Sequence, residues 1–440
     1  MRPLFKAAFF LLAGVCLSLA VPLSRADDLP SGADAEPLRR LDVPGEEYRS
    51  PLAGEGFQAD IFGERVRVEP RDRRKISAWD LGFSAVAPGV SGAEFLPYAS
   101  LYFWRRPDET QFLRAIVTGL YNDVIYSRTT SEWSPLEAVF YFGNYTIPVG
   151  QTEIVDGKRF EEEELIWGTV RAGAGLGYRR QLGDKSESDN QLAISLLAEP
   201  GFFYADETND TAPGYVAPKD TFEGRVHLKV RLDRLDRNLF ANAHSGFAAG
   251  ADLFYGWRDD WEDWGQNAQE SASSGRDYVG LSGFVKGAAR VPFVQSDRHR
   301  LIASLHGGVG DALDRFSAFR VGGGPSGDEF EAIARPILPG AVIEEYTPEK
   351  FAIALVEYRW EPVFFVFASV RTSVSYVERF RRTDTGVEES GDVLPSIGAR
   401  LYSGFFFETL VQLDYNYNFG VIRRDDYGGN EVTLHISRSF

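Results

Sequence analysis

Few residues of this 440-residue chain have the types and the spacing that enzymatic chemistry requires. Its five histidines are His227, His244, His299, His306 and His435. None of them has a second candidate ligand at the spacing that a metal site on a helix or a hairpin needs. The segment 324–328 reads GPSGD and lacks the last glycine of the G-x-S-x-G nucleophile elbow. The sequence therefore predicts no enzymatic activity, no metal site and no cofactor.

Phosphate-bearing ligands are also disfavoured. The run GAGLG at 173–177 weakly matches a nucleotide-binding loop, but it lies in an alternating segment and no helical pattern follows it. Packing of small residues within a strand is the better interpretation. The net charge of −17 argues against nucleic acid as a partner, because a phosphate backbone requires a basic surface.

Residues 1–26 have the pattern of a secretory signal. Arg2 and Lys6 form a basic start, residues 7–21 form an apolar run, and Ser24-Arg25-Ala26 is a small-x-small cleavage site. Cys16 does not indicate a lipoprotein, because Val15 precedes it where a small residue is expected. The mature chain would begin at residue 27 without cysteine, so its stability would depend on packing and hydrogen bonds rather than disulfides.

The end of the chain alternates apolar and polar residues, as a strand with one apolar face and one polar face does. One parity holds Phe405, Phe407, Val411, Leu413, Tyr415, Tyr417 and Phe419. The other parity is polar, a second alternating run covers 430–440, and Phe440 is the terminal residue, which we interpret as a barrel-closing signal. A surface hairpin of a soluble sandwich would also alternate. An exported chain with aromatics on the apolar face favours the lipid-facing closing hairpin of an outer-membrane barrel.

No stretch after the leader supplies the roughly 18 consecutive apolar residues of a membrane helix. A chain that crosses a bilayer without such a helix must form a closed barrel, because every backbone N–H and C=O group in lipid needs an internal partner. The composition agrees, with 14% aromatic residues and a mean hydropathy of only −0.23, since alternation conceals hydrophobicity in the average. We therefore predict an all-β, transmembrane antiparallel barrel in the bacterial outer membrane, surrounded by its lipid.

We expect three parts: a signal peptide at 1–26, a periplasmic tail or linker at 27–74, and the barrel at 75–440. Spanning strands of roughly 9–11 residues with their turns allow about 16 strands over the last part. Fifteen candidates can be placed, at 76–87, 97–106, 111–127, 136–147, 164–179, 190–205, 221–233, 245–257, 277–293, 298–310, 350–362, 364–379, 393–404, 405–419 and 430–440. The sixteenth is either 57–68 or a strand merged with a neighbour in this list.

The clearest candidate for a lumenal wall is the segment 222–233. One parity is apolar, and the other holds Glu223, Arg225, His227, Lys229, Arg231 and Asp233. Consecutive charged positions are too costly in lipid and suit a wet lumen. A hydrated wall is the simpler interpretation, and a site for a charged passenger is the alternative.

Short motifs follow one another in the second half of the chain, at Asp233, Asp236, Asn238, Gly246, Gly308, Gly310, Phe316, Phe319, Gly322, Gly323, Glu357, Tyr358 and Arg359. They form a strand end similar to D-x-x-D-N but with Arg237 before the asparagine, a G-x-G strand, an F-x-x-F-x-x-G-G segment and an E-Y-R strand. In this order they resemble the BamA-type superfamily of outer-membrane insertion and translocation barrels, in which the third motif leads into a long sixth loop. The resemblance implies 16 strands, with this extracellular loop folded back into the lumen and five strands after it.

The loop departs from the family pattern. In that family a loop-tip arginine in V-R-G-F or R-G-Y reaches an aspartate on the barrel wall, but residues 320–349 hold no such motif. The wall strand offers Ser369 and Arg371 where the resemblance implies the aspartate. The loop is instead acidic, with Asp328, Glu329, Glu331, Glu344 and Glu345.

Two pairings of these charges are open. The first is a charge swap, in which loop acids meet Arg371 and Arg359 on the wall, and partial shielding from water would strengthen such contacts. The second keeps a loop arginine at a shifted place, Arg335, with Glu357 as its partner. The third interpretation is that all these charges are simply solvated loop and lumen residues.

Three functions remain open from the sequence. The resemblance implies a role in inserting or translocating outer-membrane proteins or lipids at a lateral seam between the first strand and 430–440. The chain has only residues 27–74 where relatives carry client-collecting modules, so either a separate periplasmic subunit collects the client protein or the barrel does a different job. The alternatives are a passive or loop-gated porin for small charged solutes, and a barrel that binds a partner through long loops such as 259–276, which contains WRDDWEDWG.

Overall fold

The computed structural model describes residues 38–439, apart from 42, 44, 62, 91–93, 132–133, 147–148, 183–189, 267, 269–274, 384–385, 407–408 and 425. The predicted signal peptide and the terminal residue Phe440 lie outside the described residues. None of the helices in the described part is long and apolar enough to cross a membrane.

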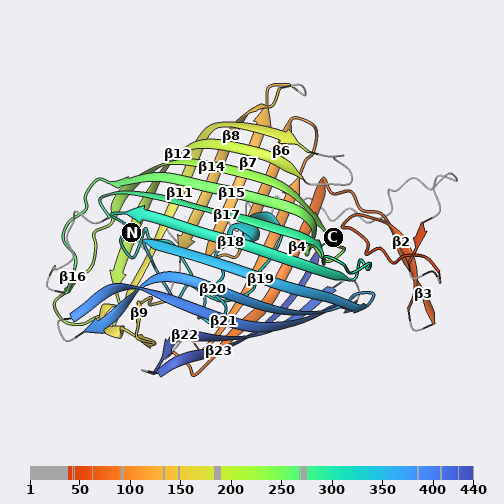
Figure 1. Ribbon diagram of the computed structural model, residues 1–440. Coiled ribbons are helices and arrows are strands. Elements are labelled where there is room, and N and C mark those ends of the chain that lie inside the picture. The colour runs from red at the N-terminus through yellow and green to blue at the C-terminus, as the bar shows by residue number, and fades with distance from the viewer. Residues whose placement is uncertain are drawn as a thin grey trace. The chain divides into compact units, whose positions relative to one another are not determined.

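Sixteen antiparallel strands form a closed barrel (Figure 1). In chain order they are β4 (Lys75–Ala87), β5 (Phe95–Arg105), β6 (Gln111–Val117), β7 (Tyr121–Thr129), β8 (Leu136–Thr146), β11 (Leu165–Gln181), β12 (Gln191–Glu207), β14 (Thr221–Arg237), β15 (Ala243–Arg258), β17 (Asp277–Arg290), β18 (His299–Asp311), β19 (Lys350–Val363), β20 (Val366–Thr383), β21 (Gly386–Phe406), β22 (Thr409–Arg423) and β23 (Asp426–Ser439). Each pairs with the next along the chain, and β23 closes the ring on β4. The predicted fold class and strand number are confirmed.

The remaining elements are short. They are β1 (Arg39–Arg40), β2 (Phe57–Ile61), β3 (Glu64–Val68), β9 (Ile154–Val155), β10 (Lys158–Arg159), β13 (Tyr215–Val216), β16 (Gly265–Gln266) and the 3-10 turns η2 (Glu161–Glu163) and η3 (Phe330–Ala334). The β2–β3 hairpin packs on the β19–β20 turn, where the rings of Phe57 and Phe364 are 5.2 Å apart. The segment 57–68 is therefore not a barrel strand.

The missing sixteenth strand came from a merged pair. The range 111–127 was predicted as one strand, and this was wrong: the chain turns at 118–120 and forms the separate strands β6 and β7. Gly119 adopts a positive φ of 83°, which glycine tolerates without strain, and the Thr118 hydroxyl donates to the Tyr121 carbonyl oxygen at 2.7 Å. The apolar residues on both sides of this turn concealed it in the sequence.

The predicted alternation of faces is confirmed along the wall. On β22 the outward Leu413 and Tyr415 are each 47% exposed, whereas Asp414 and Asn416 between them are 0% and 1% exposed. On β14 the polar parity is the inward one, and His227 and Lys229 are buried. Apolar outer and charged inner faces are what a barrel in lipid requires.

The two ends of the barrel differ in their connections. One end has short turns, such as 106–110 and 238–242, and the other has long loops. Short periplasmic turns and long extracellular loops are typical of outer-membrane barrels, which assigns the two ends. The longest connection, residues 312–349, is the sixth at the extracellular end, and five strands follow it, as the resemblance implied. We call it the lumenal loop.

Candidate functional site

The lumenal loop has a fixed fold of its own. Val321 and Tyr346 pair as an antiparallel bridge, and Gly322 pairs with Ile337 in parallel. Gly324 and Gly340 have positive φ values of 102° and 88°, where side chains are disfavoured. These contacts fold the loop back on itself, so that it enters the barrel as a compact unit.

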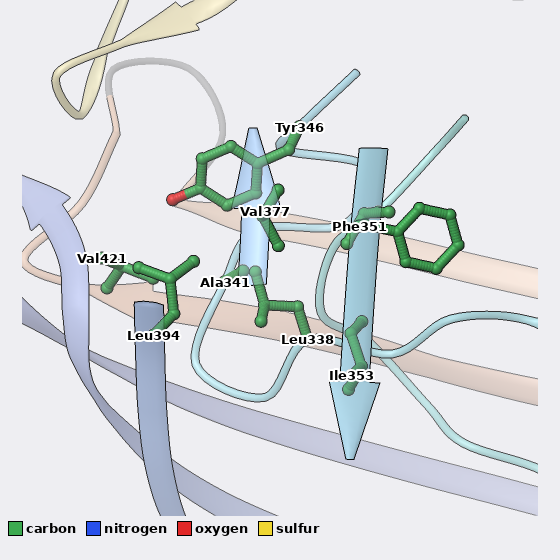
Figure 2. Close-up of a cluster of buried hydrophobic side chains, with 9 residues drawn as sticks. Leu338, Ala341, Tyr346, Phe351, Ile353, Val377, Leu394 and Val421 are labelled. Carbon is green, nitrogen blue, oxygen red and sulfur yellow. The ribbon is translucent and has the colours of Figure 1, made fainter. Parts of the chain in front are cut away.

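An apolar cluster anchors the loop to one side of the wall. Leu338 and Ala341 of the loop are fully buried, and they pack with Tyr346 in a cluster that includes wall residues of four consecutive strands (Figure 2). Those wall residues are Phe351 and Ile353 of β19, Val377 of β20, Leu394 of β21 and Val421 of β22. Burying such side chains contributes about 1.5–3 kcal/mol each, relative to exposure.

Asp328 attaches the loop to a neighbouring part of the wall, at β15 and β17. Its carboxylate forms an ion pair with Lys286 of β17 and accepts a hydrogen bond from the amide of Ala243 at 2.6 Å. The Nε of Arg237 also donates to the Asp328 carbonyl oxygen, at 2.6 Å. Burial alone would raise the pKa of Asp328, but Lys286 and the Ala243 amide outweigh burial and lower this pKa to about 2.

Glu329 and Glu331 reach further strands. Glu329 pairs with Arg73, next to β4, at 2.6 Å, and both side chains are buried. Glu331 pairs with Arg114 of β6 and with Arg231 of β14, the latter at 2.8 Å. Burial opposes the charge of Glu331, but these guanidinium groups hold its pKa well below the usual value.

Near the other end of the loop, Glu345 forms a two-pronged ion pair with Arg423 of β22, at 2.6 and 2.7 Å. Such fork-to-fork geometry is typical of strong ion pairs. Glu344 accepts a hydrogen bond from the Tyr145 hydroxyl of β8 at 2.8 Å. All five predicted acids therefore contact wall strands or the segment leading into β4.

The predicted wall partners lie elsewhere. Arg371 donates to Asn416 at 2.8 Å and lies 3.4 Å from Asp414, both on β22. Arg359 donates to the Ala243 carbonyl oxygen and lies within electrostatic range of Asp328. Glu357 is 3.8 Å from Arg400 of β21.

The loop arginine also differs from the sequence-based alternative. Among the described residues, the side chain of Arg335 makes one hydrogen bond, from Nη2 to the Gly323 carbonyl oxygen at 3.4 Å, rather than a pair with Glu357. The structure thus joins loop acids to cations, but these are not the predicted Arg371 and Arg359. They are Arg73 in the segment before β4 and, on the wall, Arg114, Arg231, Lys286 and Arg423.

Glu431 of β23 also holds the loop, and this contact was not predicted from the sequence. Its carboxylate accepts hydrogen bonds from the loop amides of Gly324 at 2.6 Å and Gly340 at 2.9 Å. It also accepts from Asn416 at 2.9 Å and from the Ser84 hydroxyl, across the closing strand pair, at 3.1 Å. The type of a residue does not show that its backbone amide will bind a carboxylate. The glycines at 322–324 and 340 were the feature of the sequence that could have indicated such a contact.

Beneath the loop lies a chamber of about 1350 Å³. Its lining reaches the periplasmic turn at 239–242 and Ser439, and at the other end it reaches Ile154. Basic side chains of β11 and β14 line it together with the loop acids. The site is therefore a polar chamber roofed by a loop that many contacts hold. The part of the chain that the structure describes contains no cluster of side chains suited to a metal ion.

We predict that E431A releases the loop. The variant leaves two buried loop amides without an acceptor, at a cost of about 1–3 kcal/mol each, so cleavage at 325–345 by added protease should accelerate about tenfold or more. The measurement is limited proteolysis of the purified barrel in detergent. E199A is the matched control, because Glu199 is a buried carboxylate whose partners Arg225 and His227 both lie on the wall. Equal cleavage rates in both variants would contradict the clamp.

We predict that acid loosens the loop only at low pH. Asp328 and Glu331 have lowered folded-state pKa values, so their contribution is complete above the ordinary carboxyl range and is lost as pH falls from about 4 toward 2. A spin label at P325C should stay immobile from pH 7 to 5 and become mobile below about pH 4. Mobility that rises between pH 7 and 5 would mean that other groups hold the loop.

Comparison of the sequence with known protein families and with curated proteins finds no match. Solved structures with a similar fold include BamA from Haemophilus ducreyi lacking POTRA domains 1–3, with a TM-score of 0.50 and 12% identity over 88% of this chain and 75% of that chain. CdiB from Acinetobacter baumannii follows with a TM-score of 0.47 and 8% identity over 89% of this chain, which spans 64% of CdiB. OccK10 (OpdN) from Pseudomonas aeruginosa has a TM-score of 0.35 and 10% identity, over 83% of this chain and 98% of that one.

The identities are low, so the likeness concerns the fold. The H. ducreyi barrel matches most of the chain, and the sixth-loop position and the five following strands agree with the resemblance found in the sequence. An apolar outer face, a charged lumen and closure without a free end strand belong to a protein that spans the outer membrane. The chain is a bacterial outer-membrane β-barrel with the BamA-type fold.

Proposed function

We propose that this barrel assists the insertion or translocation of outer-membrane proteins or lipids through its lateral seam, rather than conducting solutes along its axis. The observation that supports this most is the attachment of the lumenal loop all around the wall. Its partners belong to β6, β8, β14, β17, β22 and β23, which are distributed around the ring of strands. A loop fixed on all these sides crosses the lumen and obstructs axial passage.

The shape of the chamber also supports entry of a client from the periplasm and exit through the wall. Its lining includes the periplasmic turn at 239–242 and the end of β23, so the chamber extends to the periplasmic end of the barrel. At the extracellular end the loop and the β9 segment lie over it, and Ile154 packs with Val342 and Val86. A chamber with this asymmetry suits a client that arrives from the periplasm and leaves sideways.

The seam is the pairing between β23 and β4. It runs from Asn430 opposite Ala87 to Ser439 opposite Ala78. Glu431 joins the loop, β22 and Ser84 of β4 at one place, so loop position and seam closure share a residue. Movement of the loop would therefore change the hydrogen bonding of the same carboxylate that accepts from Ser84 across the seam.

The other two functions receive less support. A porin needs an axial path, which the fixed loop obstructs. The tryptophan-rich loop is not a free binding surface, because Trp261 and Trp264 are only 4% and 5% exposed and pack against Phe316 at the root of the lumenal loop.

We predict that the intact barrel is electrically quiet in a planar bilayer and that deletion of 325–345 produces a steady, large conductance. The physical reason is removal of the roof over the chamber. E431Q, which keeps every loop residue, should give frequent openings of intermediate size. A steady open channel in the intact protein would favour the porin function and contradict the proposal.

We predict that locking the seam abolishes function. S84C and T433C create a disulfide between register partners of β4 and β23. In cells depleted of the native protein, this variant should fail to restore the protein and lipid composition of the outer membrane, and a reductant should rescue it.

The matched control is S373C with S396C, register partners of β20 and β21 whose hydroxyls are 2.6 Å apart. This lock leaves the seam free, so the variant should restore the composition. If depletion itself leaves outer-membrane proteins and lipids unchanged, the proposed function is wrong. If both locks restore the composition, the function does not use the seam.

A further inference from the structure

The strand pairing of the wall is interrupted at one place away from the seam, between β5 and β6. Strands β4 and β5 pair along their whole length, from Lys75 opposite Arg105 to Ala85 opposite Phe95. The pairing of β5 with β6 runs only from Arg105 opposite Leu113 to Leu101 opposite Val117. The hairpin β6–β7 turns at 118–120, so the extracellular part of β5 has no ladder partner on that side among the described residues.

The free edge of β5 is adapted to lack a partner. Near the two ends of the β4–β5 ladder, the amide of Arg106 donates to the Arg74 carbonyl oxygen, and the amide of Val86 donates to the Glu94 carbonyl oxygen. The even-numbered residues of β5 therefore direct their backbone groups toward β4. Along an antiparallel strand the backbone groups of successive residues point alternately to the two neighbouring strands. The backbone groups of Phe95, Pro97 and Ala99 therefore point into the gap. Proline has no N–H group to leave unpaired, and natural sheets place it at such edges.

The chamber extends into this gap. Its lining contains Leu96, Tyr98 and Ser100 from the inner face of β5, and also Pro97 and Ala99 from the outer face. On the far side of the gap it contains Leu120 of the hairpin turn and Val149 after β8, which are 46% and 61% exposed. A cavity lined by both faces of one strand passes around the edge of that strand.

The gap lies at the depth of lipid chains. Ala99 is opposite the outward Leu81, which is 49% exposed, and Pro97 is opposite Phe83. The rings of Phe83 and Phe95 lie 4.9 Å apart, and Phe95 is on the extracellular side of Pro97. Aromatic pairs of this kind mark the membrane interface, so the gap opens into the adjoining hydrocarbon of the outer leaflet.

The inner side of the gap is amphipathic. Tyrosines from three strands line it: Tyr98 and Tyr102 of β5, Tyr121 of β7, and Tyr141 and Tyr145 of β8. Arg335 lies within electrostatic range of Tyr98 and Tyr102, and in the described part of the chain no carboxylate is paired with it. The one hydrogen bond of its side chain there is the 3.4 Å contact with the Gly323 carbonyl oxygen. The nearby Asp80 already accepts from Ser100 at 2.9 Å and lies 3.5 Å from His435.

We propose that the gap between β5 and the β6–β8 segment is a lateral portal through which an anionic acyl lipid of the membrane places its headgroup at Arg335 and its chains between the strands. The tyrosines suit the boundary between headgroup and chain, because their rings are apolar and their hydroxyls are polar. A client β-strand is the weaker occupant, since Pro97 cannot donate to it. This portal does not depend on the seam or on the proposed function.

Quenching by lipids that carry bromine on their acyl chains tests the portal. In a C16A background, S100C is labelled with a small thiol-reactive fluorophore and the barrel is placed in brominated phosphatidylglycerol or phosphatidylcholine vesicles. Ser100 points into the lumen, so loss of its fluorescence requires an acyl chain inside the wall. We expect strong quenching, greater in the anionic lipid, with that preference lost in R335Q and retained in R335K.

Two further label positions set the scale. L101C faces lipid and gives the maximal quenching. N242C lines the same chamber at its periplasmic end and reports entry from that side. The proposal is overturned if the Ser100 label is quenched no more than the Asn242 label, or if the anionic preference is absent or survives in R335Q.

Discussion

The constraint on which this structure depends is that backbone N–H and C=O groups cannot remain unpaired in lipid. Sixteen strands satisfy it by pairing in sequence and closing β23 on β4. Closure fixes the remaining properties of the wall. Alternate side chains must face hydrocarbon or the lumen, so one parity is apolar, and the other can hold charge that would be prohibitively costly outside. The buried Asp414 beside the exposed Leu413 shows this division over one residue.

A charged inner wall in turn determines what can fill the barrel. Guanidinium groups such as Arg114 and Arg423 are buried and need acceptors, and the lumenal loop supplies carboxylates. The reverse also occurs at Glu431, where the wall supplies the carboxylate and the loop supplies amides. A buried ion pair gains little over an apolar contact of the same volume, but a buried charge without its partner is costly. Without the loop, buried charges on several strands would lose their partners. This cost fixes the position of the loop in the lumen.

Much of the fold could be predicted from the sequence, because the alternation of apolar and polar residues appears between residues that are close together in the chain. The charged face of 222–233 and the polar face of β22 can be identified from residues two apart, and the order of short motifs located the sixth loop. The β6–β7 turn could not be identified, because Val117, Leu120 and Tyr121 continue an apolar pattern and only Gly119 interrupts it. The partners of the loop acids depend on loop path and strand tilt, which are long-range properties. Thus the acidic character of the loop was informative, whereas the choice of Arg371 as its partner rested on the position of one family contact.

The same closure constraint also clarifies the interruption at β5. A full-length β6–β7 hairpin would pair every group of β5, and the position of Pro97 would then leave a neighbouring carbonyl without a donor. With the short hairpin, the groups of Phe95 and Ala99 face a chamber with tyrosine hydroxyls and a guanidinium nearby, where polar groups or water can satisfy them. Closure of the ring and access through the wall are therefore compatible. The barrel needs continuous pairing only where its backbone meets hydrocarbon alone, and a polar chamber behind one short hairpin permits an opening without parting β23 from β4.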